Sequence, residues 1–106
     1  MKVSDAFPSE YFRAADVSGD GIALTIRSVQ TEEMMDGKRR RCIEFEEIDK
    51  RLIVNKTNFL KIADVLKEDN DDRWIGRRIR LVRDRVPFKG DLVAAIRVTA
   101  APNGLQ

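Results

Sequence analysis

Residues 52–81 read LIVNKTNFLKIADVLKEDNDDRWIGRRIRL, and this stretch decides the fold of the chain. It contains a short apolar segment, an amphipathic segment, an acidic loop, the single tryptophan and the start of a basic strand. The apolar side chains of the amphipathic segment recur at the spacing of one helical face: Phe59, Ile62, Ala63 and Leu66. The pattern therefore predicts one α-helix over about residues 56–66, and the segments before and after it should pack on its apolar stripe.

Strand patterns surround this helix. Apolar and polar side chains alternate, as in half-buried strands, over residues 22–29, 39–48, 52–54, 77–86 and 92–98. The Asp-Gly pair at residues 36–37 and the sequence of residues 87–90 are typical of turns that join two strands. The apolar phase slips at Val29 and again over residues 82–85, so we expect β-bulges at both places.

The predicted order is three strands, one helix and two strands, which makes the fold class mainly β. This is the connectivity of the OB-fold, a five-stranded Greek-key barrel, here with one α-helix between strands 3 and 4. Closing the sheet into a barrel would also remove its exposed edge strands. The alternative is an open five-stranded sheet with the helix on one face.

A chain of 106 residues is long enough for a single domain over residues 1–106. We expect an N-terminal arm or short helical turn over residues 1–20, the barrel over residues 21–99 and a flexible tail over residues 100–106. At 42% hydrophobic and 36% charged residues, the composition is that of a globular chain. We find neither a signal peptide nor an apolar run of ~20 residues, so the expected location is cytoplasmic, with no membrane partner.

The residue types limit the chemistry that the chain can perform. The absence of histidine excludes Ser-His-Asp and Cys-His nucleophiles and His-containing zinc sites. The one cysteine, Cys42, cannot form an internal disulfide, although neighbouring arginines could lower its pKa. Asp69, Asp71 and Asp72 could hold a cation only weakly, because an exposed acidic loop is usually just solvated. We therefore expect a protein that is not an enzyme, with no catalytic residues, no metal and no cofactor.

Two basic segments point to a partner, although the net charge is only +2. One is residues 38–41, and the other is residues 73–89, with seven basic residues and one acidic residue. In an OB-fold, a single strand crosses strands 2 and 3 between the loop of strands 1 and 2 and the loop of strands 4 and 5. The two segments should therefore flank one groove that binds single-stranded DNA, with phosphates on the cations and a base stacked on Phe88. The expected nucleic-acid-binding residues are Lys38, Arg39, Arg40, Arg41, Arg51, Arg83, Arg85, Phe88 and Lys89.

Other interpretations stay open. Acidic residues on or beside the same strands could pair with the arginines and leave only a solvated surface: Glu44, Glu46, Glu47 and Asp49. Phe88 could belong to the core. The acidic loop of residues 68–72 and the basic strand after it also form a bipolar surface that could self-associate. The alternative function is therefore a protein-interaction or assembly module, with a protein partner or with itself.

Four motifs, in this order along the chain, carry a family resemblance: Val54-Asn55-Lys56-Thr57-Asn58, Asp71-Asp72 before Trp74-Ile75-Gly76, Val86 with Phe88-Lys89-Gly90, and Ala95-Ile96-Arg97-Val98. The set resembles a family of small phage and prophage proteins with the patterns LNKTN, DDWIGK, VxFxG and AIRV. The resemblance covers residues 11–98 and departs from the pattern at Arg73. The family is of uncharacterised function, so it implies no catalytic residues. It implies a phage or prophage gene near genes of replication or recombination.

Overall fold

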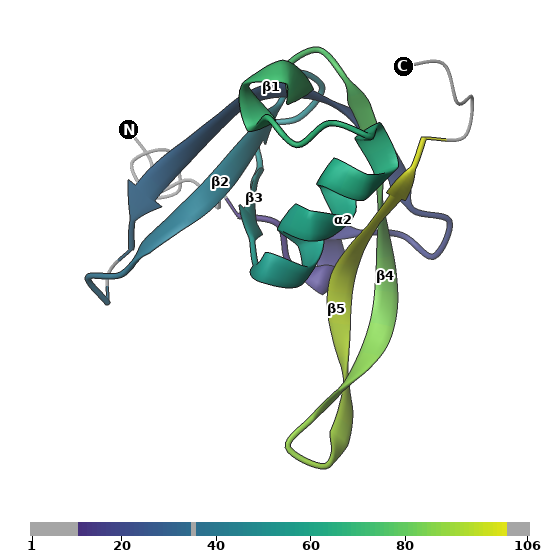
Figure 1. Ribbon diagram of the computed structural model, residues 1–106. Coiled ribbons are helices and arrows are strands. Elements are labelled where there is room, and N and C mark those ends of the chain that lie inside the picture. Colours follow the sequence, from purple (N-terminus) through teal and green to yellow (C-terminus); the bar gives the residue numbers. More distant parts are fainter. Residues whose placement is uncertain (1–10, 35, 102–106) are drawn as a thin grey trace, which may run out of the picture.

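The computed structural model describes residues 11–34 and 36–101, in which five antiparallel strands form one sheet with a single α-helix (Figure 1). The fold is therefore mainly β, and the helix lies between the third and fourth strands, as predicted. The elements are β1 (Ile22–Glu33), β2 (Arg39–Phe45), β3 (Arg51–Val54), α2 (Lys56–Leu66), β4 (Arg78–Phe88) and β5 (Asp91–Ala100), with 3-10 turns at Ala14–Asp16 and Asp71–Trp74. The expectations for residues 1–10 and 102–106 lie outside the described residues.

The sheet is open, with the strand order β3-β2-β1-β4-β5. The predicted closed barrel is not observed, and the open sheet of the alternative prediction agrees with the structure. Other parts of the chain bond to both end strands. Tyr11 forms a parallel bridge to Arg51, and the Phe12 N–H donates to the Arg51 carbonyl at 2.8 Å, so the outer edge of β3 is occupied. The Asn58 Nδ2 atom of α2 donates to the Ile96 carbonyl of β5 at 2.9 Å.

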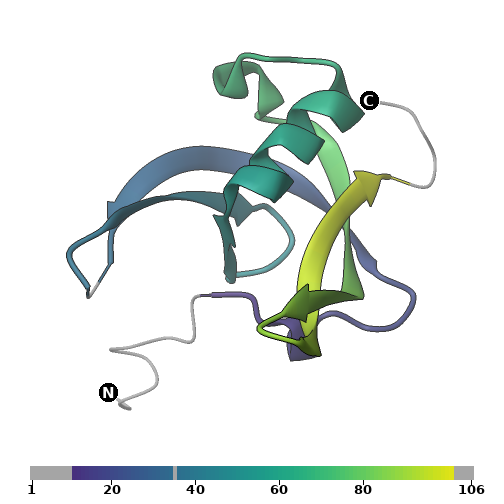
Figure 2. The same cartoon turned by 60° about the horizontal axis from the view of Figure 1, so that its bottom comes forward.

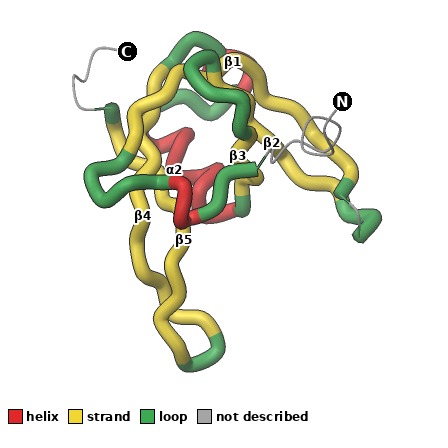
Figure 3. The backbone as a smooth tube through the Cα atoms, turned by 180° about the vertical axis from the view of Figure 1, so that it is seen from behind, coloured by secondary structure: helices red, strands yellow, loops and turns green. Residues whose placement is uncertain are grey.

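The strand β1 joins the two halves of the sheet. Its first residues pair with β4 and its later residues pair with β2, with a register shift between Ile26 and Ser28, close to the bulge expected at Val29. The bulge expected over residues 82–85 is wrong, because β4 and β5 pair without a shift from Ile79 to Phe88. The apolar pattern slips there for another reason: the β4–β5 hairpin leaves the body of the molecule, so its outer residues have no core to face (Figures 1 and 3).

The core lies between α2 and the sheet, and Figure 2 shows the helix lying across the curved sheet between the two hairpins. Trp74 is fully buried, its ring lies 5.0 Å from the ring of Phe59, and its Nε1 donates to the Glu68 carbonyl at 2.9 Å. Asn55 caps the start of α2 by accepting a hydrogen bond from the Asn58 N–H at 2.8 Å. Packing of this helix therefore fixes the bases of both hairpins.

Candidate nucleic-acid interface

The β1–β2 hairpin carries the first basic segment. Its turn follows Asp36 and Gly37, and the Asp36 carboxylate accepts a hydrogen bond from the Lys38 N–H at 2.9 Å. The side chains of Lys38, Arg39 and Arg40 are exposed, and no ion pair joins them to an acid within residues 11–34 and 36–101. These three cations are therefore available to an anionic ligand.

Arg41 is held by the body of the protein. Its Nη1 atom lies 2.7 Å from a carboxylate oxygen of Asp71, and its guanidinium carbon lies 5.1 Å from the centre of the Phe59 ring. The pair is partly buried, with 20% of the Asp71 side chain exposed. A ligand phosphate would have to compete with this carboxylate, so Arg41 contributes less charge to the surface than its neighbours do.

Arg51, on β3, is also in a structural ion pair. Its guanidinium contacts Glu32 of β1 and lies 5.1 Å from the centre of the Tyr11 ring, while the Tyr11 hydroxyl donates to the same glutamate at 3.3 Å. The cluster ties the N-terminal segment to the sheet. The structure thus gives Arg51 a stabilising role, and its predicted role in binding stays a prediction.

The β4–β5 hairpin carries the second basic segment. Arg83, Arg85 and Lys89 are exposed, and no acid forms an ion pair with them in the described part of the chain. The chain reverses at Lys89 and Gly90, which both have positive φ, 50° and 85°, as a two-residue turn of type I′ requires. The predicted turn of four residues is thus shorter, and the strands reach Phe88 and Asp91.

Phe88 is exposed, which settles one open alternative. Its exposed fraction is 57%, so it is not a core residue, and the Lys89 ammonium lies 5.3 Å from the centre of its ring. An aromatic ring at the end of a hairpin with a cation beside it can stack on a base and contact a phosphate.

The acids near β2 do not neutralise the exposed arginines. Glu44 pairs with Arg27 at 3.7 Å and accepts from the Ser28 hydroxyl at 2.7 Å. Glu47 accepts hydrogen bonds from the backbone N–H and the hydroxyl of Thr25, which lower the pKa of its carboxyl although partial burial acts to raise it. The alternative of a salt-bridged surface therefore does not extend to Arg39 and Arg40.

The two basic segments line different hollows. One, of about 380 Å³, lies between the start of β2 and the start of α2, and its lining includes Arg39, Arg41 and Lys56. The other, of about 430 Å³, is lined by Arg83, Asp84, Arg85 and Ala94. The helix α2 lies between the two hairpins (Figure 1). Neither hollow is lined by both segments, and the shared groove stays a prediction.

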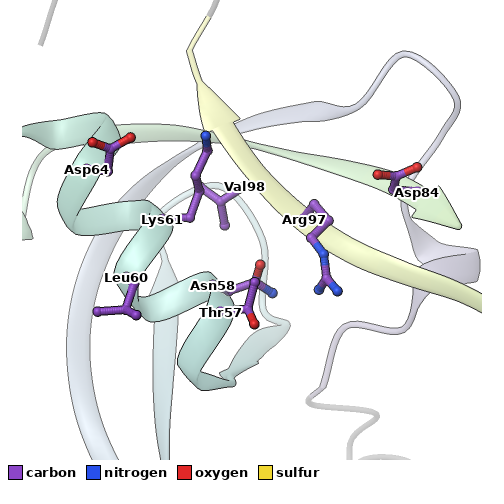
Figure 4. A pocket seen from close by; sticks show the side chains of 8 residues that line it. All are labelled: Thr57, Asn58, Leu60, Lys61, Asp64, Asp84, Arg97 and Val98. Carbon is purple, nitrogen blue, oxygen red and sulfur yellow. The ribbon is translucent and has the colours of Figure 1, made fainter. Parts of the chain in front are cut away.

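The sequence prediction missed a pocket of about 480 Å³ between α2 and β5, shown in Figure 4. Its lining includes Lys61, Asp64 and Arg97, and Asn58 lies at its base with 3% of its surface exposed. The Oδ1 atom of Asn58 has no hydrogen-bond partner among the described residues. The signal was present in the sequence as an asparagine on the apolar face of the predicted helix.

Cys42 is inside the protein, not in a reactive position. It is fully buried, and burial, together with the nearby Glu32, raises the pKa of its thiol to about 11. The neighbouring arginines therefore do not lower the pKa of the thiol: Arg40 is exposed to solvent and Arg41 is paired with Asp71, so burial dominates and Cys42 is a packed core residue.

Within residues 11–34 and 36–101, no group of three or more Cys, Asp or Glu side chains is placed to hold a metal ion. The same residues include no helix with the length and apolar character needed to cross a membrane. No family model, no curated protein and no solved structure matches this chain. The proposals below therefore rest on the geometry and charges of the molecule and on the motif resemblance.

Proposed function

We propose that the chain binds single-stranded nucleic acid, most directly single-stranded DNA, through the exposed cations of its two hairpins. One observation carries the proposal: six basic residues near the ends of the two hairpins are exposed and form no ion pair with an acid in the described part of the chain, whereas Glu44 and Glu47 bond elsewhere. Unpaired cations release counterions from phosphates when a strand binds, which favours association at low salt. The residues that would contact phosphates are Lys38, Arg39, Arg40, Arg83, Arg85 and Lys89.

We also propose that the open sheet is a variant of the OB-fold. The strand order β3-β2-β1-β4-β5, with α2 after β3 and with β1 shared by both halves, is that of a five-stranded Greek-key barrel opened between β3 and β5. In such folds the two loops that correspond to these hairpin turns border the ligand. The motif resemblance to phage and prophage proteins implies only a context, a gene near genes of replication or recombination, and single-stranded DNA is present in such processes. We propose a cytoplasmic protein without catalytic activity.

The test is a titration of fluorescently labelled oligo-dT of about 20 nucleotides, followed by anisotropy at several salt concentrations. We expect binding at low salt that weakens steeply as salt rises. The double variants Arg39→Ala/Arg40→Ala and Arg83→Ala/Arg85→Ala should each lower the affinity about tenfold and reduce the salt slope by about 1.4, the value for two phosphate contacts on a single strand. Arg41 is left unchanged, because its removal would leave the Asp71 carboxylate unpaired.

Arg73→Ala is the matched control. The Arg73 side chain is 74% exposed and lies 3.9 Å from Glu68, and Arg73 belongs to the 3-10 turn at Asp71–Trp74, before β4 begins. Its removal should leave the affinity within about twofold of wild type, because an isolated exposed pair of this kind contributes little. Absence of binding at low salt, or equal losses in the control and in both double variants, would contradict the proposal.

The second candidate is a protein-interaction or assembly module that self-associates. Exposed apolar side chains at the end of the β4–β5 hairpin favour it: Phe88, Leu92 and Val93 have exposed fractions of 57%, 62% and 38%. Light scattering of the same samples without nucleic acid separates the two candidates. A dimer or larger assembly that Leu92→Asn disperses, together with no binding to oligo-dT, would replace the first proposal by the second.

A further inference from the structure

The outer end of the β4–β5 hairpin carries apolar side chains on both of its faces. Pro87 pairs directly with Leu92, and Phe88 pairs directly with Asp91, so Leu92 shares a face with Pro87. Successive residues of a strand point to opposite faces, which places Phe88 on the other face. Both side chains are more than half exposed, at 62% for Leu92 and 57% for Phe88. Val93, which is 38% exposed, shares the face of Phe88, so the exposed apolar side chains at this end lie on both faces of the hairpin instead of on one.

The hairpin is a single layer, and it extends away from the body of the protein (Figures 1 and 3). Its register is continuous to the turn, and its tight two-residue turn keeps the end narrow. A narrow ribbon with an apolar end has the shape of a pin that can enter a gap in a partner and contact both walls.

Charge on the hairpin indicates what the partner is. Arg83 and Arg85 alternate with Pro87 on β4, so they share the face of Leu92. The acids of the hairpin, Asp84 and Asp91, lie on the other face. The face of Leu92 is therefore a cationic track that leads to an apolar tip, which is complementary to a strand with phosphates outside and bases inside.

We propose that the β4–β5 hairpin is a pin that inserts at the junction between single-stranded and double-stranded DNA, with Leu92 against the last base of one strand and Phe88 stacked on the base of the other. The proposal rests on the proposed function, and it names the form of nucleic acid that this site prefers. Arg83 and Arg85 hold the phosphates of the strand that passes along their face, and the Lys89 ammonium, 5.3 Å from the Phe88 ring centre, lies beside the stacked base.

Dimensions favour a fork over intercalation into an intact duplex. A strand layer with side chains on both faces is about 10 Å thick. Stacked bases are about 3.4 Å apart, so the hairpin is about three times too thick to enter a single step between stacked pairs. At a fork the two strands are already parted, and the terminal base pair costs the least to open.

The test compares three labelled DNA molecules by anisotropy: oligo-dT, a blunt duplex, and a fork made from the same duplex with two unpaired dT arms. We expect wild type to bind the fork at least about fivefold more tightly than oligo-dT of the same total unpaired length, as one added base contact predicts. A 2-aminopurine in the first base pair of the fork should become more fluorescent when the protein binds, because that base leaves the stack.

Leu92→Asn removes one apolar wall of the pin without disturbing the core, since the side chain is 62% exposed. It should abolish both the fork preference and the 2-aminopurine signal while oligo-dT binding stays within about twofold. Leu60→Asn is the matched control, with the same substitution at a side chain that is 57% exposed on α2, and it should behave as wild type.

The outcomes separate this inference from the proposed function. If wild type binds oligo-dT without any preference for the fork, the proposal that the hairpin inserts at a junction is wrong, and the proposal of single-strand binding is unaffected. A fork preference that survives Leu92→Asn would also overturn the proposal of insertion. Absence of binding to every DNA would overturn both proposals together.

Discussion

The β1–β2 and β4–β5 hairpins both carry arginine-rich segments, but they differ in how many of their arginines form ion pairs within the protein. In the first, the Arg41 Nη1 atom lies 2.7 Å from an Asp71 carboxylate oxygen, and the guanidinium lies over the Phe59 ring. Asp71 therefore neutralises part of the positive charge of this hairpin. In the second, no ion pair joins Arg83 or Arg85 to an acid within the described residues. The difference shows that the charge a ligand meets depends on which acids the fold brings close, and the sequence charge alone does not give it.

The base of the first hairpin depends on Trp74, which gives the largest effect that we expect. Trp74 is fully buried and contacts Phe59, on which Arg41 rests. Trp74→Ala should lower the free energy of unfolding by about 3–5 kcal/mol, because it leaves a large cavity in the core. Urea denaturation followed by circular dichroism measures this change.

Leu92→Ala, at the end of the second hairpin, should have a much smaller effect on stability than Trp74→Ala. The side chain is 62% exposed, so the substitution should change the free energy of unfolding by less than about 0.5 kcal/mol. A loss of more than about 2 kcal/mol would mean that the second hairpin is packed against another part of the protein, and the contrast between the hairpins would fail.

The sequence predicted the elements well where periodicity and packing agree. The helix stripe from Phe59 to Leu66 and the strand alternation around it follow directly from burial on one face. It failed at the closure of the sheet, because the N-terminal segment at Tyr11 and Phe12 pairs with the edge of β3 through a backbone hydrogen bond, and the Asn58 side chain bonds to the edge of β5 at Ile96. The backbone pairing of the N-terminal segment leaves no pattern in the side chains. It also failed over residues 82–85, where the apolar phase slips although the register is continuous.

The free energy of unfolding should also depend on alkaline pH, because Cys42 in β2 titrates there. Burial raises the pKa of this thiol to about 11, from an ordinary value of 9.0. The unfolded chain therefore loses its thiol proton at lower pH than the folded chain, so the free energy of unfolding falls as pH rises from about 9 to about 11. Two pH units correspond to a loss of about 2–3 kcal/mol.

Cys42→Ala is the variant that tests this titration. Its own free energy of unfolding should be lower at neutral pH, but it should lose about 2–3 kcal/mol less than wild type between pH 9 and pH 11. Denaturation curves at three pH values measure the difference. Parallel pH profiles for the two proteins would mean that the thiol is not the group that titrates.

The candidate site was predictable in part, for a physical reason. Exposed basic segments beside turns can be identified from the sequence, and Arg39, Arg40, Arg83 and Arg85 are exposed in the structure. Whether an acid neutralises a given arginine cannot be identified from the sequence in this way, because the acid can lie far along the chain. Arg41 and Asp71 are separated by 30 residues and meet only through the packing of α2 and the 3-10 turn at Asp71–Trp74.

Removal of the Asp71 charge tests the neutralisation of Arg41 directly. Asp71→Asn keeps the size of the side chain and removes its charge, so Arg41 becomes available to a phosphate. The affinity for oligo-dT should rise about threefold at low salt, and the salt slope should steepen by about 0.7, the value for one more phosphate contact. Stability should fall by no more than about 1 kcal/mol, because 47% of the Arg41 side chain is exposed and water screens the pair.

Asp72→Asn is the matched control, because it changes the net charge by the same amount at the neighbouring position. The Asp72 carboxylate is exposed and forms no ion pair in the described part of the chain. A gain in affinity for Asp71→Asn alone would show that one folded-state contact sets the charge of the first hairpin. Equal gains in both variants would mean that overall charge governs binding, and the two hairpins would then differ in packing but not in their electrostatic contribution.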